Sequence, residues 1–162
     1  MGTKQIDSFS GDYRFLSNFY PTTVELDVVR YLSVEHAYQA AKTLDLEARV
    51  PILAMTASQA KSYGRKVVLR PDWESVKLDV MVGLLRQKFD PARYPILTEK
   101  LVDTRSRELI EGNTWHDLWW GRCNCSYHKS RGENWLGRLL MQVRTELDTA
   151  IEKTTTERQG SR

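Results

Sequence analysis

The sequence lacks several features that would assign it to a functional class directly. Its 162 residues contain two cysteines, Cys123 and Cys125, which lie too close together in the chain for a useful structural disulfide. We expect reduced thiols and therefore a cytoplasmic location. No apolar run approaches the ~20 residues that a membrane-spanning helix needs, and the N-terminus has no signal-like apolar segment. We expect no membrane partner.

Charge of one sign is also missing. The 24 lysines and arginines nearly balance the 21 acidic residues, and the net charge of +3 does not predict strong nonspecific binding to nucleic acid. The chain contains no complete phosphate-binding loop, and no basic helix or DNA-binding motif supports a sequence-specific nucleic-acid binder. The 41% hydrophobic and 28% charged residues are typical of a globular protein.

Hydrophobic patterning predicts an α+β fold: a mainly α-helical single domain with one small antiparallel β-sheet. A short hairpin is expected between Thr22 and Leu32, turning near Asp27. Apolar residues at helical spacing predict the helices, at 34–44, within 51–63, from 71 or 72 to about 89, at 94–102 and from 135 to about 151. We expect one domain over residues 1–152 and a disordered polar tail at 153–162.

The segment from Tyr31 to Lys42 is the first candidate site. Ser33 is a plausible N-cap, and the alanines behind it favour a helix. Glu35, Gln39 and Lys42 lie four and then three residues apart, so they share one helix face. They could form the wall of a polar pocket, or they could be a solvated stripe with an ordinary ion pair. Spacing alone does not decide between these interpretations.

The aromatic loop at 112–122 is the second candidate site. Trp115, Trp119 and Trp120 lie within six residues. Core packing explains one or two of them, and a stacking platform for a base or heterocycle would explain another. Asp117 is either a hydrogen-bonded structural cap or a second carboxylate of the site.

Two further segments could bind an anion. Trp73 either packs in the first turn of its helix or stacks on a ring whose phosphates Arg65, Lys66 and Arg70 would hold. Segment 129–134 ends at a helix N-terminus, beside a glycine, which is a geometry suited to an anion.

A metal site is not predicted. His116, Cys123, Cys125 and His128 are four possible ligands in a short span. Zinc sites usually have C-x₂₋₄-C pairs, whereas this chain has C-x-C, and its histidines follow a different rhythm. A Cys–His nucleophile pair is no better supported, because nothing marks either thiol as activated.

Four sequence blocks, taken in order, give the chain a recognisable pattern. They are Phe15-Leu-Ser-Asn-Phe19; Ser33-Val-Glu-His-Ala-Tyr-Gln-Ala-Ala-Lys42; Gly64-Arg65 through Trp73-Glu-Ser-Val-Lys77; and Asn113-Thr-Trp-His-Asp-Leu-Trp-Trp-Gly121 followed by Asn134-Trp-Leu-Gly-Arg-Leu-Leu-Met141. Over residues 9–148 the chain resembles the YbiA/NADAR family. It departs from the family between Gly121 and Asn134, where the family has short glycine- and lysine-rich loops.

The resemblance implies an N-glycosidase of mainly helical α+β fold that needs no metal and no cofactor. It implies two substrate classes: ADP-ribose attached to guanine, in a nucleotide or a nucleic acid, and the phosphorylated ribosylaminopyrimidines of riboflavin synthesis. Glu35 matches the catalytic glutamate of the family, and Asp117 and Trp73 match residues of the same pocket. The other matched positions, with a catalytic role considered for the lysine, are Lys42, Asn18, Phe19, Gln39, Arg65, Trp120, Gly121 and Asn134.

Cleavage of a C–N bond at an anomeric carbon develops oxocarbenium character on the ribose. Glu35 is expected to activate water or stabilise this cation, kept ionised by the helix N-terminus. Asp117 would orient the ribose or assist the leaving group, and Trp73 and Trp120 would sandwich a ring. Attack by Lys42 to form a Schiff base is a second path, which requires a depressed pKa.

The alternative class is a module that binds ADP-ribose without cleaving it. Such a module needs aromatic and basic side chains but no pair of carboxylates, so the sequence favours the enzyme through Glu35 and Asp117. The sequence does not determine the oligomeric state.

Overall fold

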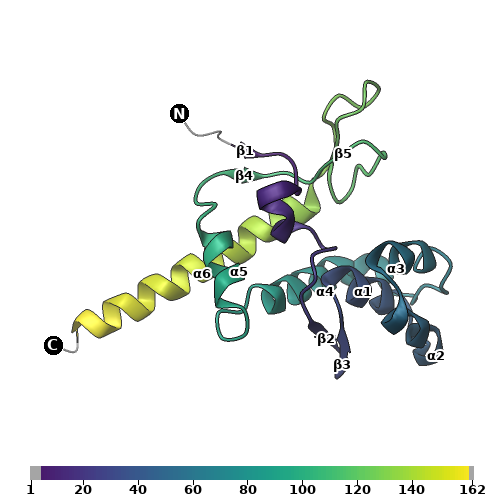
Figure 1. The fold of residues 1–162 in the computed structure, drawn as a ribbon, viewed down its shortest axis with the longest axis horizontal. Helices are drawn as coiled ribbons and strands as arrows, with labels where there is room; N and C mark the ends of the chain where they lie inside the picture. The colour runs from purple at the N-terminus through teal and green to yellow at the C-terminus, as the bar shows by residue number, and fades with distance from the viewer. Residues whose placement is uncertain (1–4, 161–162) are drawn as a thin grey trace. The chain divides into compact units, whose positions relative to one another are not determined.

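The computed structural model describes residues 5–160, which form two compact units (Figure 1). One unit contains residues 5–16 and 91–160, and the other contains Ser17–Asp90. Helices dominate both units and strands occur as short pairs, so the predicted mainly helical α+β class is confirmed. The predicted domain boundary at residue 152 stays a prediction.

The unit at Ser17–Asp90 begins with the predicted hairpin. Strands β2 (Val24–Leu26) and β3 (Val29–Tyr31) are antiparallel, with Val24 opposite Tyr31. The two residues between them, Asp27 and Val28, both have positive φ, at 48° and 62°. Two-residue hairpin turns favour such values because they match the twist of the strands. The hairpin and its turn at Asp27 are confirmed.

Helices make up the rest of this unit. They are α1 (Val34–Ala41), α2 (Leu46–Arg49), the 3₁₀ helix η2 (Val50–Ala54), α3 (Ala57–Tyr63) and α4 (Trp73–Lys88). Ser33 caps α1 as predicted, because its hydroxyl accepts a hydrogen bond from the backbone N–H of His36. Gly64 follows the last residue of α3, and Asp72 and Phe89 flank α4, in agreement with the predicted boundaries.

Helix α1 lies at the centre of its unit. It packs against α3, α4 and the β2–β3 hairpin, and all eight of its residues are buried. The sequence predicts one core-facing side for this helix and a polar stripe on the other. Neighbours on several sides instead bury Glu35 and Gln39 of the polar stripe as well.

The other unit contains η1 (Gly11–Leu16), α5 (Pro95–Val102), α6 (Trp135–Gly160) and two short strand pairs. Strand β1 (Gln5–Ile6) pairs with β4 (Glu108–Leu109), and β5 (Gly112–Asn113) pairs with β6 (Arg122–Cys123); both pairs are parallel. Besides the predicted antiparallel hairpin, the described residues thus contain two parallel pairs. Each strand is two residues long, which is too short for a period-two pattern in the sequence.

Helix α6 is longer than expected. It packs on β4 and α5 through its first turns and continues to Gly160, across most of the segment for which disorder was expected. Thr149 and Thr154 donate hydrogen bonds to the carbonyls four residues earlier, which satisfies their hydroxyls within a helix. Residues 161–162 lie outside the described residues.

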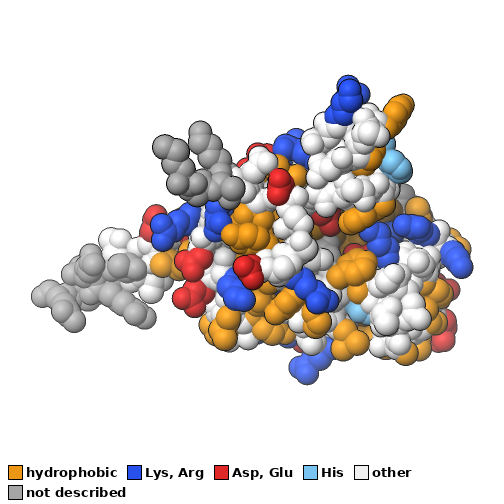
Figure 2. Space-filling model, turned by 45° about the horizontal axis from the view of Figure 1, so that its top comes forward, with side chains coloured by type: hydrophobic (Ala, Val, Ile, Leu, Met, Phe, Trp, Pro, Cys, Tyr) orange, Lys and Arg blue, Asp and Glu red, His pale blue; other side chains and the backbone are white. Residues whose placement is uncertain are grey.

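None of the helices described between residues 5 and 160 is both long and apolar enough to cross a membrane. Basic, acidic and hydrophobic side chains are interspersed on the face displayed in Figure 2. This mixture agrees with the nearly balanced charge of the sequence.

Candidate active site

A buried carboxylate marks the centre of the candidate site. The side chain of Glu35, in the first turn of α1, is 5% exposed. Nε2 of Gln39, one turn later, donates a hydrogen bond of 2.7 Å to Oε1 of Glu35. The interpretation of the stripe as a solvated helix face is therefore wrong for these two residues. They form a buried polar pair.

Burial raises the pKa of Glu35 above the usual value for a glutamate. This shift is opposed, but not cancelled, by Lys61, by the hydrogen bond from Gln39 and by Lys42. The sequence suggested that the helix N-terminus would keep Glu35 ionised, and removal of the carboxyl from water has the larger effect here. A raised pKa suits a carboxyl group that accepts and returns a proton near neutral pH.

Positive charge gathers beside Glu35. Lys42, directly after α1, is half-buried, and its ammonium lies 5.6 Å from the centre of the Tyr38 ring. Burial lowers the pKa of Lys42; Lys61 and Arg65 lower this pKa further, and Glu35 raises it. Lys42 and Lys61 thus both act on the Glu35 carboxylate, and Arg65 acts on Lys42.

Two buried amide oxygens are left without hydrogen-bond partners among the described residues. They are Oδ1 of Asn18 and Oε1 of Gln39. The backbone carbonyl of Asn18 accepts from the N–H of Glu35 at 3.0 Å, which ties this residue to the start of α1. Buried polar atoms are normally paired, so such atoms are candidates for contact with hydroxyl or amino groups of a ligand.

Gly64 explains how the Gln39 side chain fits beside α3. A Cβ atom at this position would collide with Oε1 of Gln39 and press on the rest of its side chain. The absence of a side chain at Gly64 therefore lets α3 end against α1. The sequence showed Gly64 as a helix stop, and the structure gives it this second role.

The aromatic residues of this unit differ in exposure. Trp73 begins α4, is 5% exposed, and lies against Tyr38 with ring centres 5.1 Å apart. Its packing role is thus satisfied within the protein, and its role as a stacking platform stays a prediction. Phe19 is 36% exposed, with the Lys61 ammonium 5.8 Å from its ring centre. Arg65 is exposed.

The remaining predicted residues lie in the other unit, where Asp117 organises the aromatic loop. Its Oδ1 accepts hydrogen bonds from the backbone N–H groups of Trp119 and Trp120, at 3.1 and 2.9 Å. Asn113 bonds both the N–H and the C=O of Asp117. The structural-cap interpretation of Asp117 is therefore confirmed, and a catalytic role for its carboxylate stays a prediction.

The loop tryptophans are partly exposed. Trp115 is 59% and Trp119 39% exposed, and Trp120 is half-buried. The ring of Trp119 packs against Trp135, at the start of α6, with centres 5.7 Å apart. Core packing thus accounts for part of this cluster, and a platform for a ligand ring stays a prediction.

Gly121 and Asn134 fix this loop against residues 109–111. A Cβ at Gly121 would collide with the carbonyl oxygen of Glu111, so only glycine permits this close approach. The buried side chain of Asn134 accepts from the N–H of Glu111 at 3.0 Å and donates to the carbonyl of Leu109 at 2.8 Å. Asn134 directly precedes α6, as expected, and its amide braces residues 109–111. Its expected help in holding a phosphate stays a prediction.

Sequence reasoning missed three residues. Lys61 is a source of positive charge beside Glu35, and Tyr38 is the ring partner of Trp73. Lys88, the last residue of α4, is fully buried and donates to the carbonyl of Ser17 at 2.6 Å. Their helical positions were predicted, but nothing in their spacing indicated these partners.

Comparison with known proteins supplies a further observation. The family model described as "NADAR domain" matches residues 6–148. The N-glycosidase YbiA of Escherichia coli (strain K12) is 36% identical over 149 residues, covering 90% of this chain and 88% of that protein. The NMR structure of the E. coli protein YbiA matches with a TM-score of 0.74 at 35% identity, covering 93% of this chain and 86% of that one.

A second group of similar proteins is longer. The chloroplastic riboflavin biosynthesis protein PYRR of Zea mays is 34% identical over 149 residues, covering 81% of this chain. The chain spans 23% of the length of that protein. A riboflavin biosynthesis protein of Vibrio vulnificus is 34% identical over 139 residues, and the chain spans 36% of its length.

Proposed function

The chain belongs to the NADAR family, and from this premise we propose that it is an N-glycosidase that removes ADP-ribose from guanine. Water would add to the anomeric carbon of the ribose while the bond from that carbon to the base nitrogen breaks. Free ADP-ribose and the unmodified base would be the products.

The single observation that carries this proposal is the buried carboxyl of Glu35 among cationic side chains. Glu35 is 5% exposed, and Lys61 and Lys42 both act on its pKa. A purely structural salt bridge would not need the raised pKa, whereas a group that takes the proton of an attacking water benefits from it. The same carboxylate would stabilise positive charge on the ribose ring in the transition state.

The neighbouring polar groups support the recognition of a ribosyl phosphate. The amide oxygens of Asn18 and Gln39 that lack partners can accept hydrogen bonds from ribose hydroxyls or a base amino group. Lys42, Lys61 and Arg65 provide positive charge for phosphates. The negatively charged pyrophosphate of ADP-ribose is opposite in sign to these three side chains.

A second substrate class is favoured by the names of similar proteins. Two of these proteins are called riboflavin biosynthesis proteins. Phosphorylated ribosylaminopyrimidines carry the same chemical elements as the first class: a ribose, a bond from its anomeric carbon to nitrogen, and a phosphate. The same residues would act on them, so the choice of substrate is decided by a product screen.

The lowered pKa of Lys42 supports a mechanistic variant. A neutral amine at this position could attack C1 of the ring-opened sugar and form a Schiff base while the bond from C1 to the base nitrogen breaks and the base leaves with a proton; water would then hydrolyse the Schiff base and free the sugar. Borohydride would reduce this adduct to a stable secondary amine. Recovery of a Lys42 peptide that carries the reduced adduct, detected by mass spectrometry, would support this path. If the peptide stays unmodified during turnover, the mechanism is hydrolysis assisted by Glu35.

The test is a product screen with both substrate classes against the wild type and Glu35→Gln. We expect wild-type protein to release free ADP-ribose from guanine-linked ADP-ribose, and Glu35→Gln to lower turnover roughly a hundredfold or more. The substitution keeps the size of the side chain and removes its charge. Chromatography of the products identifies which class is cleaved.

Glu47→Gln is the matched control, because Glu47 is an exposed glutamate of α2. It should retain wild-type turnover. Wild-type turnover in a folded Glu35→Gln protein would refute the role of Glu35. Binding of guanine-linked ADP-ribose without any product would identify the chain as a binding module instead.

A further inference from the structure

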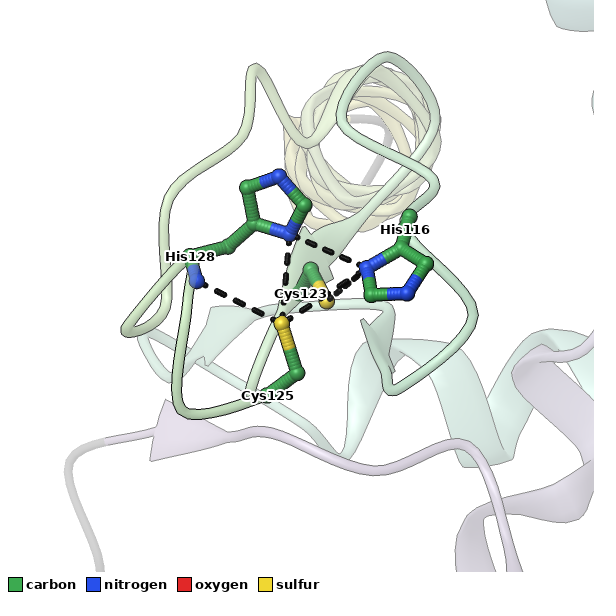
Figure 3. Close-up of side chains that lie close together, drawn as sticks. All are labelled: His116, Cys123, Cys125 and His128. Atoms are coloured by element: carbon green, nitrogen blue, oxygen red, sulfur yellow. Dashed lines mark hydrogen bonds between the residues drawn. The ribbon is translucent and has the colours of Figure 1, made fainter.

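Four metal-ligating side chains converge between β5 and α6, and three of them lie between Gly121 and Asn134, where the chain departs from the family pattern. They are His116, Cys123, Cys125 and His128, and Figure 3 shows them pointing toward one another. One ligand atom of each residue lies within 4.8 Å of the corresponding atoms of the other three. None of these residues belongs to the proposed glycosidase site.

Four of the six separations between these atoms are close to those of a tetrahedral metal site. Nδ1 of His116 lies 3.2 Å from Nδ1 of His128 and 3.8 Å from Sγ of Cys123. Sγ of Cys125 lies 3.6 Å from Nδ1 of His116 and 3.2 Å from Nδ1 of His128. Tetrahedral zinc, with bonds of about 2.0 Å to nitrogen and about 2.3 Å to sulfur, separates its nitrogens by about 3.3 Å and nitrogen from sulfur by about 3.5 Å.

The backbone explains why C-x-C can supply two ligands here. Cys123 ends β6, and the backbone N–H of Asn124 continues the ladder by donating to the carbonyl of Asn113 at 2.7 Å. In an extended segment, side chains two residues apart point to the same side. Cys123 and Cys125 therefore point to the same side of the loop. The usual C-x₂₋₄-C spacing belongs to a tighter turn.

The two histidines arrive by separate turns. The N–H of Lys129 donates to the carbonyl of Cys125 at 2.9 Å, and this turn brings His128 back over the sulfur. The N–H of His128 also donates to Sγ of Cys125 at 3.3 Å, a contact that stabilises a thiolate. His116 lies across the loop with a positive φ of 67°.

We propose that His116, Cys123, Cys125 and His128 bind one structural Zn²⁺ ion. Two thiolates and two neutral imidazoles are a common ligand set for this ion, and both thiols lose their protons when it binds. Four protein ligands leave no open coordination position for water, so the ion does not activate a nucleophile. Its role is to fix the loop that carries Asp117 and the aromatic cluster.

The experiment is metal analysis of untagged, full-length protein purified without chelators. Mass spectrometry of the metals should find one zinc per chain in the wild type and in the control Ser126→Ala, which changes an exposed residue between two of the ligands. Cys125→Ser should lose most of the zinc. Wild-type protein with far less than one zinc per chain, or Cys125→Ser with as much zinc as the wild type, would overturn the proposal.

Two measurements on the wild type keep the test independent of how well the variant folds. Replacement of the metal by Co²⁺ should give the strong visible bands of a tetrahedral site and a thiolate-to-cobalt charge-transfer band. X-ray absorption at the zinc edge should resolve two sulfur and two nitrogen neighbours. A shell of oxygen and nitrogen alone would mean zinc bound at another position, and the assignment would be wrong.

Discussion

Burial lowers the pKa of Lys88 more than it lowers the pKa of Lys42 in the same unit. Its side chain is fully buried, and its ammonium lies 5.6 Å from the centre of the Tyr20 ring and 5.3 Å from that of Phe89. Burial lowers the pKa of Lys88 from 10.5 to about 7. The folded protein therefore gives up a proton that the unfolded chain retains at mildly alkaline pH.

This residue makes the stability of the fold depend on pH in a defined direction. Between about pH 7 and pH 10.5 the unfolded chain binds more protons at Lys88 than the folded protein does, so the free energy of unfolding rises with pH. Below pH 7 both states hold the proton, and this contribution is constant. We expect Lys88→Met to flatten the rise, as measured by urea unfolding at a series of pH values.

Lys66→Met is the control for this prediction, because Lys66 is exposed in the same unit. It should keep the wild-type dependence on pH. An equally steep rise in Lys88→Met and the wild type would mean that Lys88 titrates normally in the folded protein.

Residue-level prediction succeeded where a local pattern defined the residue. Ser33 was recognised as an N-cap from its position before an alanine-rich run, and the structure confirms its hydrogen bond to His36. The burial of Glu35 and Lys88 could not be predicted in this way, because it depends on packing by elements distant in the chain. The sequence therefore suggested an ionised Glu35, and burial moves its pKa in the other direction.

At the scale of the elements, contact between α1 and α3 depends on Gly64. A methyl group there would meet the Gln39 side chain, which is 3% exposed and bonded to Glu35. We expect Gly64→Ala to lower the free energy of unfolding by about 1–3 kcal/mol through overpacking. Because Gln39 must move, turnover should fall as well. Thermal unfolding and steady-state kinetics measure the two effects.

Gly83→Ala is the matched control in α4. A Cβ at Gly83 has open space around it, and alanine favours a helix interior over glycine. This substitution should raise the free energy of unfolding by about 0.5–1 kcal/mol and leave turnover unchanged. Equal effects of the two substitutions would show that close contact at Gly64 has no special role.

Elements with long apolar repeats or a hairpin turn were predictable, and the pairing of the two-residue strands was not. The bounds of α4 and of the β2–β3 hairpin follow from periodicity and turn residues. The parallel pairs β1–β4 and β5–β6 join strands of only two residues, so no local pattern encodes their pairing. The sequence showed four possible ligands at 116–128, but their convergence could not be predicted, since it depends on the β5–β6 pairing.

At the scale of the whole molecule, the family match and the buried apolar residues described in α6 both end before residue 152. The match runs to residue 148. Among the residues of α6 with described side chains, the buried apolar ones lie in its first turns: Leu136, Leu139, Leu140 and Val143. Ile151 is 51% exposed, and the following residues with described side chains are exposed as well. The side chains described after residue 150 thus add no core to the unit.

Removal of the residues after Glu152 tests the domain boundary expected from the sequence. The deleted side chains that are described are exposed, so their loss should change the free energy of unfolding by no more than about 0.5 kcal/mol. Leu140→Ala, which removes a fully buried side chain of the same helix, should cost about 2–5 kcal/mol. Urea unfolding compares the two proteins. A truncation as destabilising as Leu140→Ala would move the boundary beyond residue 152, because the end of α6 would then contribute to the folded unit.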